Sequence, residues 1–340
     1  MNQNKRYYLF GAIVLILVFF LSFYRLPYYV YQPGSADALN PIVAVDDGFE
    51  SEGDMHLVTV RGGPATAIQY ALAKIRPFHE VYKKEEIYPE GVSNNEYMHA
   101  QLQLMESSQE AATVVAYKAA EKELNIEYKG VYVMSVMDDV QASDVLKIGD
   151  RIIKVDNQPI KKSEDLLDYV KSKEVGDEVE VTFERKQEKQ TKTIEMVKHP
   201  DEDRAIIGIT LVTDRDVVVE PPVNFSSGEI GGPSAGLMFS LEIYDQLTEQ
   251  DITKGYQLAG TGSISYEGEV GRIGGIDQKV VAADKDGVDI FFAPNEGGEQ
   301  GSNYQVAKQT AEEIGTDMKV VPVDTFDDAL HYLEGVQAPE

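Results

Sequence analysis

The sequence predicts an α+β protein behind an apolar N-terminal helix, and three observations support this prediction. Short β-rich runs and helix-periodic runs are mixed along the 340 residues without an internal repeat. Residues 127–197 have their own series of strands around one helix and end at a charged linker. Residues 7–24 carry no charged side chain. We therefore expect a β-rich insert within a larger mixed domain, preceded by a membrane span.

The uncharged N-terminal run is long enough to cross most of a hydrocarbon core. We expect a transmembrane helix over residues 7–26 and a short cytoplasmic tail at 1–6, because Lys5 and Arg6 precede the run. A cleaved signal peptide is the alternative, but no Ala-x-Ala-like site follows. The predicted location is therefore the cell membrane, single-pass, with the remainder of the chain extracytoplasmic.

The amino-acid composition argues against several classes of function. The formal charge of −27 makes nucleic acid an unfavourable partner. The absence of cysteine excludes disulfides, thiol catalysis and cysteine-ligated zinc. Acidic residues between positions 46 and 54 miss the calcium-loop spacing, so we expect no metal site, and we expect no cofactor.

Residues 31–125 are predicted to form the first part of the mixed domain. Pro41–Val45 and Met55–Arg61 are β-rich and form a hairpin-like pair. Helical periodicity follows over Ala65–Ile75 and over Asn94–Leu124.

Residues 126–198 resemble a PDZ domain. The resemblance depends on an Ala-Ser-x-x-Leu-x-x-Gly-Asp-x-Ile-x-x-Val-Asp-Asn pattern at Ala142–Asn157, between a strand at Gly130–Val136 and a helix that begins at Ser163. In such domains an extended peptide adds to a sheet edge beside the helix. The resemblance implies a peptide groove, and a packing module without a ligand is the alternative. The implied groove residues are Gly130, Val131, Tyr132, Val133, Leu166 and Val170.

After the linker, residues 205–336 are predicted to form the second part of the mixed domain. We expect strands at 205–211, 217–219, 256–260, 288–293 and 318–323, and helices after Ser234 and at 276–284, 303–314 and 324–333.

Ser234 has two interpretations. It follows a Gly-Gly-Pro turn and precedes an apolar helix, so it could simply start that helix. It could also be a nucleophile, with backbone N–H groups at the helix start to stabilise an oxyanion. The five histidines are scattered and lie in no motif, which disfavours a histidine base without excluding it.

Lys279 is the better candidate for a base. A helix that starts after Gly275 places it on one apolar face with Ile276, Val280 and Ala283. Burial lowers the pKa of a lysine, so its neutral amine could accept a proton from a hydroxyl group. The alternative is a lysine whose stem packs while its ammonium group reaches water.

These residues together resemble the Lon protease family. The resemblance depends on Gly232-Pro233-Ser234-Ala235-Gly236 and on Gly268-x-Val270-x-x-Ile273-Gly274-Gly275-Ile276-x-x-Lys279. With the N-terminal run and the PDZ-like insert, the chain is similar to membrane-anchored, PDZ-containing Lon-like serine proteases of Gram-positive bacteria. The resemblance implies the α+β Lon-type fold (ribosomal protein S5 domain 2-like), with Ser234 and Lys279 as catalytic residues. Gly232, Pro233 and Ala235 would support the turn and the oxyanion, Thr261 could contact Lys279, and ring-shaped homo-oligomers are possible.

The sequence also departs from the family pattern. Gly231 replaces an aspartate that often precedes the Gly-Pro-Ser motif, and Ser263 replaces a glutamate. No G-x-x-x-x-G-K-[ST] phosphate loop is present, so we expect no ATP-driven unfolding. The resulting hypothesis is an ATP-independent endopeptidase that cleaves flexible secreted or surface proteins, with the PDZ-like module helping to select them. The alternatives are a catalytically silent peptide-binding scaffold and, less favoured, a small-molecule kinase of similar architecture.

Overall fold

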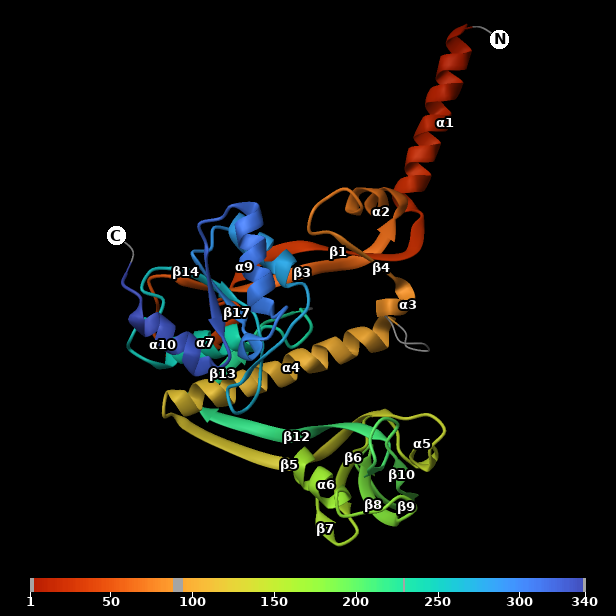
Figure 1. Ribbon diagram of the computed structural model, residues 1–340, viewed down its shortest axis with the longest axis vertical. Helices are drawn as coiled ribbons and strands as arrows, with labels where there is room; N and C mark the ends of the chain where they lie inside the picture. Colours follow the sequence, from red (N-terminus) through yellow and green to blue (C-terminus); the bar gives the residue numbers. More distant parts are fainter. Residues whose placement is uncertain (1–2, 88–93, 229, 339–340) are drawn as a thin grey trace. The chain divides into compact units, whose positions relative to one another are not determined.

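The chain forms two units in the computed structural model, which describes residues 3–87, 94–228 and 230–338 (Figure 1). Unit 1 combines Met1–Glu123 with Val219–Glu340, and unit 2 is the intervening segment Leu124–Val218. Residues 1 and 2 of the predicted cytoplasmic tail lie outside the described residues. The predicted start of the mixed domain at residue 31 falls inside the first strand, β1 (Arg25–Ala38), so that boundary is wrong.

The N-terminal run is helical. Helix α1 spans Gln3–Phe23, and apolar side chains along it, including Phe10, Leu15 and Phe19, are exposed. Over the residues described, the structure contains no helix with both the length and the apolar character needed to cross a membrane. The helix is therefore observed, whereas the predicted span at 7–26 is not supported.

Unit 1 is built on a six-stranded mixed sheet. Its strand order is β18-β17-β14-β3-β1-β4. Strands β3, β14, β17 and β18 run parallel, and β1 is antiparallel to both β3 and β4. The strands after β1 are β3 (Asp54–Thr66), β4 (Glu80–Lys83), β14 (Gln257–Gly260), β17 (Ile290–Pro294) and β18 (Lys319–Val323). Helices α8 (Ile276–Lys285) and α9 (Asn303–Ile314) make the crossovers between the last three parallel strands.

Both faces of this sheet are covered, as expected for parallel strands. Phe291 points to the face that packs with α8 and α9, whereas its neighbour Phe292 contacts Tyr332 of helix α10 (Phe326–Gly335) on the other face. Helix α7 (Gly236–Leu247) lies on the α10 face and packs against the long helix α4 (Asn94–Ala119). Complete burial of both phenylalanines explains why β17 is apolar throughout.

The predicted hairpin between Pro41–Val45 and Met55–Arg61 is wrong. Strand β2 (Val43–Val45) pairs with β13 (Val223–Phe225), and β3 pairs with β1 and β14. The predicted membrane span included Arg25 and Leu26 of β1, and no strand was predicted over the rest of this segment, so its pairing with β3 was missed. The smaller elements of unit 1 are α2 (Ala67–Ala73), α3 (Lys84–Ile87), β15 (Ser263–Ile264) and β16 (Val270–Gly271).

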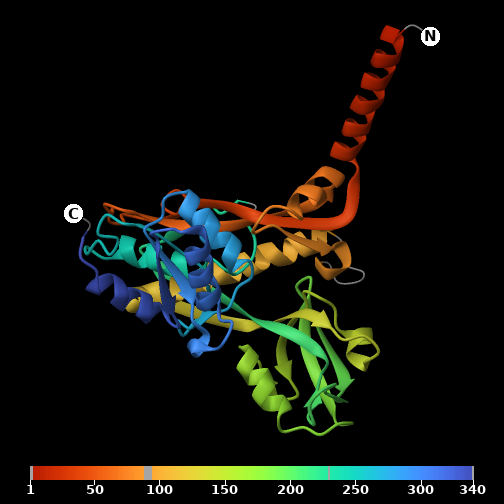
Figure 2. The same ribbon diagram turned by 45° about the horizontal axis from the view of Figure 1, so that its top comes forward.

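Unit 2 contains a sheet with the order β12-β5-β6-β8-β9, and β7 pairs with β6 (Figure 2). Its core includes inward residues of β5, β6 and β8, Leu166 and Val170 of the helix α6, and the more distant Ala142, Ile194 and Ala205. The elements are β5 (Glu123–Val136), α5 (Gln141–Val145), β6 (Arg151–Val155), β7 (Gln158–Pro159), α6 (Ser163–Val170), β8 (Glu178–Arg185), β9 (Glu188–Glu195), β10 (Val197–Lys198), β11 (Ala205–Ile206) and β12 (Ile209–Glu220).

The structure corrects the predicted peptide groove. Strand β5 pairs with β6 on one side and β12 on the other, so it has no open edge for an added peptide. The four apolar groove residues Val131, Val133, Leu166 and Val170 are buried in the core, as is Gly130, whereas Tyr132 is exposed. The edge strand beside α6 is β12, whose Thr213 Oγ1 accepts a hydrogen bond of 2.9 Å from the Ser163 backbone N–H. The sequence did not reveal this because β12 lies more than 70 residues after β5.

The close packing around the first turn of α7 can be tested by a substitution at Gly236. A Cβ atom on Gly236 would lie 2.7 Å from Ile264 Cγ2 and 2.9 Å from the Ile264 backbone nitrogen. Because backbone cannot move aside cheaply, Gly236→Ala is expected to lower the free energy of unfolding by about 1–3 kcal/mol. Gly335→Ala is the control, since a Cβ atom added there would have no neighbour within 4 Å. Equal urea-unfolding midpoints for the two variants would contradict the packing described.

Candidate active site

Ser234 lies in the turn immediately before α7. The N-cap of that helix is Ala235, with no side-chain capping bond, so the Ser234 hydroxyl does not cap the helix. Ser234 is half-buried, and its Oγ lies 2.8 Å from Lys279 Nζ. The interpretation of Ser234 as a helix-starting residue is therefore wrong.

Hydrogen bonds from two segments, α4 and the residues after β14, hold the backbone of the turn that carries Ser234. The Gly232 N–H donates to the Gln101 carbonyl of α4 at 2.8 Å, and Ser108 Oγ of the same helix donates to the Pro233 carbonyl at 3.0 Å. The Ser234 carbonyl accepts from the Gly262 N–H at 2.9 Å. Gly232 has φ +94°, a conformation that favours glycine. The nucleophile candidate is thus fixed through its backbone while its side chain stays free to react.

Lys279 enters the site from the first turn of α8. It is 4% exposed, on the same buried face as Ile276, Val280 and Ala283. This burial rules out the alternative in which the ammonium group reaches water. Desolvation lowers the pKa of Lys279 to about 7, and the N-terminal end of the α8 dipole acts in the same direction. A neutral amine is therefore well populated near neutral pH.

Thr261 fixes the direction of the lysine amine. Its hydroxyl donates to the Ser234 carbonyl at 3.0 Å, so its oxygen accepts from Lys279 Nζ at 2.8 Å. Thr261 directly follows β14 and is fully buried. With one N–H of the neutral amine directed to Thr261, the nitrogen lone pair can accept the Ser234 hydroxyl proton.

The predicted supports of the oxyanion differ in what they can donate. The Gly232 N–H is already used by Gln101, and Pro233 has no N–H. Within residues 3–87, 94–228 and 230–338, neither the Ser234 nor the Ala235 backbone N–H has a hydrogen-bond acceptor. These two groups are the candidates for stabilising a developing oxyanion.

Sequence reasoning missed Gln101 and Ser108. Both lie in α4, more than 120 residues before Ser234, and act on backbone atoms of the turn. Nothing in the sequence around a serine in a helix indicates that its hydroxyl contacts the backbone of a distant turn. Ser108 is only 4% exposed, but its burial depends on packing between α4 and α7 that no local pattern reports.

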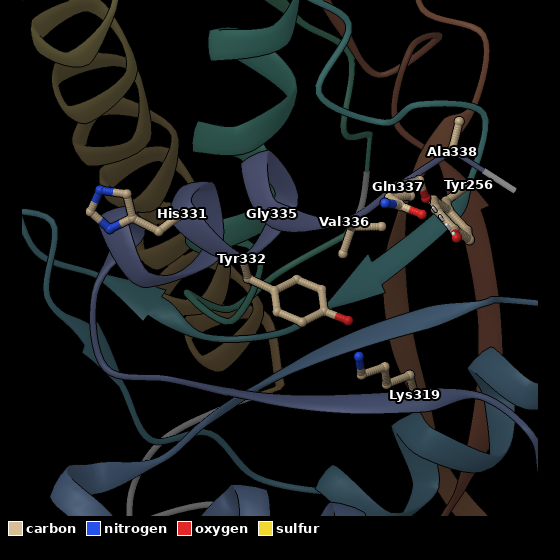
Figure 3. A pocket seen from close by; sticks show the side chains of 8 residues that line it. All are labelled: Tyr256, Lys319, His331, Tyr332, Gly335, Val336, Gln337 and Ala338. Atoms are coloured by element: carbon tan, nitrogen blue, oxygen red, sulfur yellow. Dashed lines mark hydrogen bonds between the residues drawn. The ribbon is translucent and has the colours of Figure 1, made fainter.

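A separate cavity of about 670 Å³ lies between α10, β18 and the C-terminal segment (Figure 3). The Lys319 ammonium lies 5.0 Å from the ring centre of Tyr332, and the Tyr256 hydroxyl donates to the Gln337 carbonyl at 3.0 Å. Neither Ser234 nor Lys279 lines it. His331 lines this cavity and not the Ser234 site. In the described part of the chain, no cluster of three or more His, Asp or Glu side chains is arranged to hold a metal ion.

Comparisons with known families match two parts of the chain. Residues 211–334 match the model of the Lon protease (S16) C-terminal proteolytic domain, and residues 103–196 match that of a PDZ domain. The first segment contains Ser234, Thr261 and Lys279, and the second covers most of unit 2. These matches support the predicted Lon-like and PDZ-like modules and the class of serine peptidase.

Curated relatives agree with the first match. The chain is 32% identical over 99 residues to the Lon protease of Aster yellows witches'-broom phytoplasma and 35% identical over 100 residues to that of Campylobacter concisus, in both cases over 29% of this chain. The Lon protease of Methanosphaera stadtmanae is 30% identical over 129 residues, which are 38% of this chain. The matched segments are 11–14% of the length of these relatives.

The similar solved structures cover about a quarter of the chain. The PDZ domain of an SdrC-like protein from Listeria monocytogenes is 42% identical and covers 25% of this chain and 90% of its own, with a TM-score of 0.24. A protein from Geobacillus thermodenitrificans is 40% identical and covers 24% of this chain and 95% of its own, with a TM-score of 0.23.

Burial of Lys279 makes stability depend on pH. Between pH 7 and 10.5 the unfolded lysine binds a proton that the folded amine does not, so stability rises with pH through this window. Lys279→Met removes the linkage and is expected to stabilise the protein most at pH 6, by on the order of a few kcal/mol, with the gain shrinking toward pH 10. Urea unfolding at both pH values measures it. A gain independent of pH would show that Lys279 is not desolvated.

Proposed function

We propose that this protein is a serine endopeptidase in which Ser234 is the nucleophile and Lys279 the general base. One observation carries the proposal: the buried Lys279 amine lies 2.8 Å from the Ser234 hydroxyl oxygen. A serine beside a neutral lysine is an established nucleophile–base pair that needs neither histidine nor metal.

The first half of the proposed reaction forms an ester. Ser234 Oγ bonds to the peptide carbonyl carbon while its proton passes to Lys279 Nζ. The carbonyl oxygen becomes an oxyanion, which the Ser234 and Ala235 N–H groups stabilise. The C–N bond then breaks, and Lys279 returns the proton to the leaving amine. The product is an acyl-enzyme ester on Ser234.

Water completes the reaction at the same site. Lys279, neutral again, takes a proton from a water molecule, whose oxygen bonds to the ester carbonyl carbon. The bond to Ser234 Oγ breaks, and the proton on Lys279 returns to that oxygen. Thr261 is the positioning residue that keeps the lone pair of Nζ directed at the serine through both halves.

We further propose that the reaction does not need ATP and that its substrates are flexible peptides or small secreted and surface proteins. The missing phosphate-loop motif supports this, because a peptidase without an unfolding motor can cleave only chain that is already extended. Cleavage of a folded protein that required added ATP would contradict it.

The PDZ-like unit is proposed to select substrate by strand addition to β12. Ile209 and Leu211 of β12 and Tyr169 of α6 pack over the unit's core and give this edge apolar contacts. Leu211→Asp is expected to weaken binding of a substrate-derived peptide. Thr191→Asp is the control and should leave binding unchanged, because Thr191 lies in β9, the strand at the opposite edge of the sheet. Equal binding by both variants would exclude the β12 edge.

The proposed location is extracytoplasmic and attached to the membrane through the N-terminal segment, as in the Gram-positive Lon-like proteases that the sequence resembles. Its support is the sequence alone: the uncharged run at 7–24, preceded by Lys5 and Arg6. Proteinase added to cells stripped of their wall should digest units 1 and 2. Full protection of both would contradict this location.

Cleavage of a disordered reporter such as casein, without ATP and with a metal chelator, tests the proposed function. The full chain in detergent is expected to cut casein with a rate that rises as pH passes 7, because the free Lys279 amine is the base. Ser234→Ala should lower the rate by roughly 10³-fold or more. Ser240→Ala is the matched control, since among the described residues that hydroxyl donates its hydrogen bond to the Leu237 carbonyl of its own helix and not to a residue of the Ser234 site. Cleavage that survives Ser234→Ala would refute the assignment.

A further inference from the structure

A second pocket of about 390 Å³ lies in unit 1, on one face of β1 and β3 beside α2. Cross-strand partners Gln32 and Arg61 line it from the sheet, and Gln69 and Leu72 line it from α2. Val60, the residue before Arg61, points toward Gly275 at the start of α8. Because successive side chains of a strand point to opposite faces of the sheet, Arg61 points to the face away from α8. The pocket is therefore separate from the Ser234 site, and the inference does not rest on the proposed function.

The charge of this pocket is opposite to that of the protein. Among the described residues, its lining includes Arg25, Arg61, Arg76 and His79 and no aspartate or glutamate, in a chain with 58 acidic and 31 basic residues. Over the described residues, none of the three arginines forms an ion pair or a side-chain hydrogen bond within the protein. We call this feature the arginine pocket.

All three arginines are exposed to solvent, and no carboxylate among the described lining residues neutralises them, so their combined positive potential attracts anions. Acidic side chains are abundant elsewhere on the chain, so their absence from the part of the lining that the structure describes is a specific feature of this site. His79 adds a ring whose Nδ1–H donates to the Pro77 carbonyl at 2.9 Å, so its Nε2 donates to an anion only when the ring carries both protons.

The number and type of donors indicate the class of anion. A carboxylate offers two oxygens in one plane and is satisfied by one bidentate arginine. A phosphate group presents three acceptor oxygens and up to two negative charges, which suits planar guanidinium groups that approach from several directions. Arg25 and Arg61 come from the sheet strands, whereas Arg76 follows α2, so the pocket supplies such separate directions.

We propose that the arginine pocket binds a phosphate group. Free phosphate and the headgroup of an anionic phospholipid share this chemistry. Arg25, which lines the pocket, lies two residues after the end of α1 at Phe23, so a bound headgroup would lie near the end of this apolar helix.

The test uses the full chain in a zwitterionic detergent or with vesicles. Calorimetric titration with inorganic phosphate at fixed ionic strength measures the first source. Flotation with phosphatidylcholine vesicles, with and without phosphatidylglycerol, measures the second as the increase caused by the anionic lipid. The variants are Arg61→Gln and Arg76→Gln, alone and combined. Lys74→Gln is the matched control, because it removes the same charge at the end of α2 but does not line the pocket.

Each arginine variant is expected to weaken phosphate binding about tenfold, with Lys74→Gln unchanged. Loss of only the phosphatidylglycerol-dependent increase, again with Lys74→Gln unchanged, would identify a lipid headgroup as the source. Binding that is equal in the wild type and the double variant overturns the proposal in both arms. So does arginine-dependent binding of a polyglutamate peptide without any phosphate or lipid effect, since it would assign the pocket to acidic peptides.

Discussion

Burial of the Lys279 amine against the Ser234 hydroxyl is the interaction on which the candidate site depends. In water the lysine would be protonated and could not accept a proton at neutral pH. Because burial removes it from water, the amine has a pKa of about 7, and its hydrogen-bond partners are the hydroxyl oxygens of Ser234 and Thr261. Desolvation thus makes a side chain that would be a cation in water available as a base at neutral pH.

The rest of unit 1 holds three chain segments close together at the Ser234–Lys279 pair. The turn before α7 brings Ser234, the end of β14 brings Thr261, and the first turn of α8 brings Lys279. Strand β14 is paired on both sides, with β3 and β17, so Thr261 begins from a fixed strand end. Helix α4 secures the turn from the other side through backbone contacts. Close approach of α7 to β15 is possible because Gly236 has no side chain.

Local sequence patterns predicted the parts of this protein that depend on local order. The apolar spacing around Lys279 places a charged residue on a buried helix face, and the Gly-Pro-Ser turn precedes a periodic helix, so both segments were predictable. Pairing between distant segments was not. Strand β1 was not predicted, β2 was paired with the wrong strand, and β12 was not recognised as the partner of β5. Gln101 and Ser108 were missed for the same reason, since their contacts cross more than 120 residues.

The central claim is that Lys279 is a neutral amine in the folded protein at physiological pH. The most direct measurement is an NMR titration of the full chain with lysines labelled at the ε-carbon, with Lys279→Met used to assign the resonance. The account predicts that the Lys279 signal titrates near pH 7, about three pH units below the value of an unperturbed lysine. A Lys279 signal that titrates with the surface lysines would contradict it, because a protonated amine cannot be the base for Ser234.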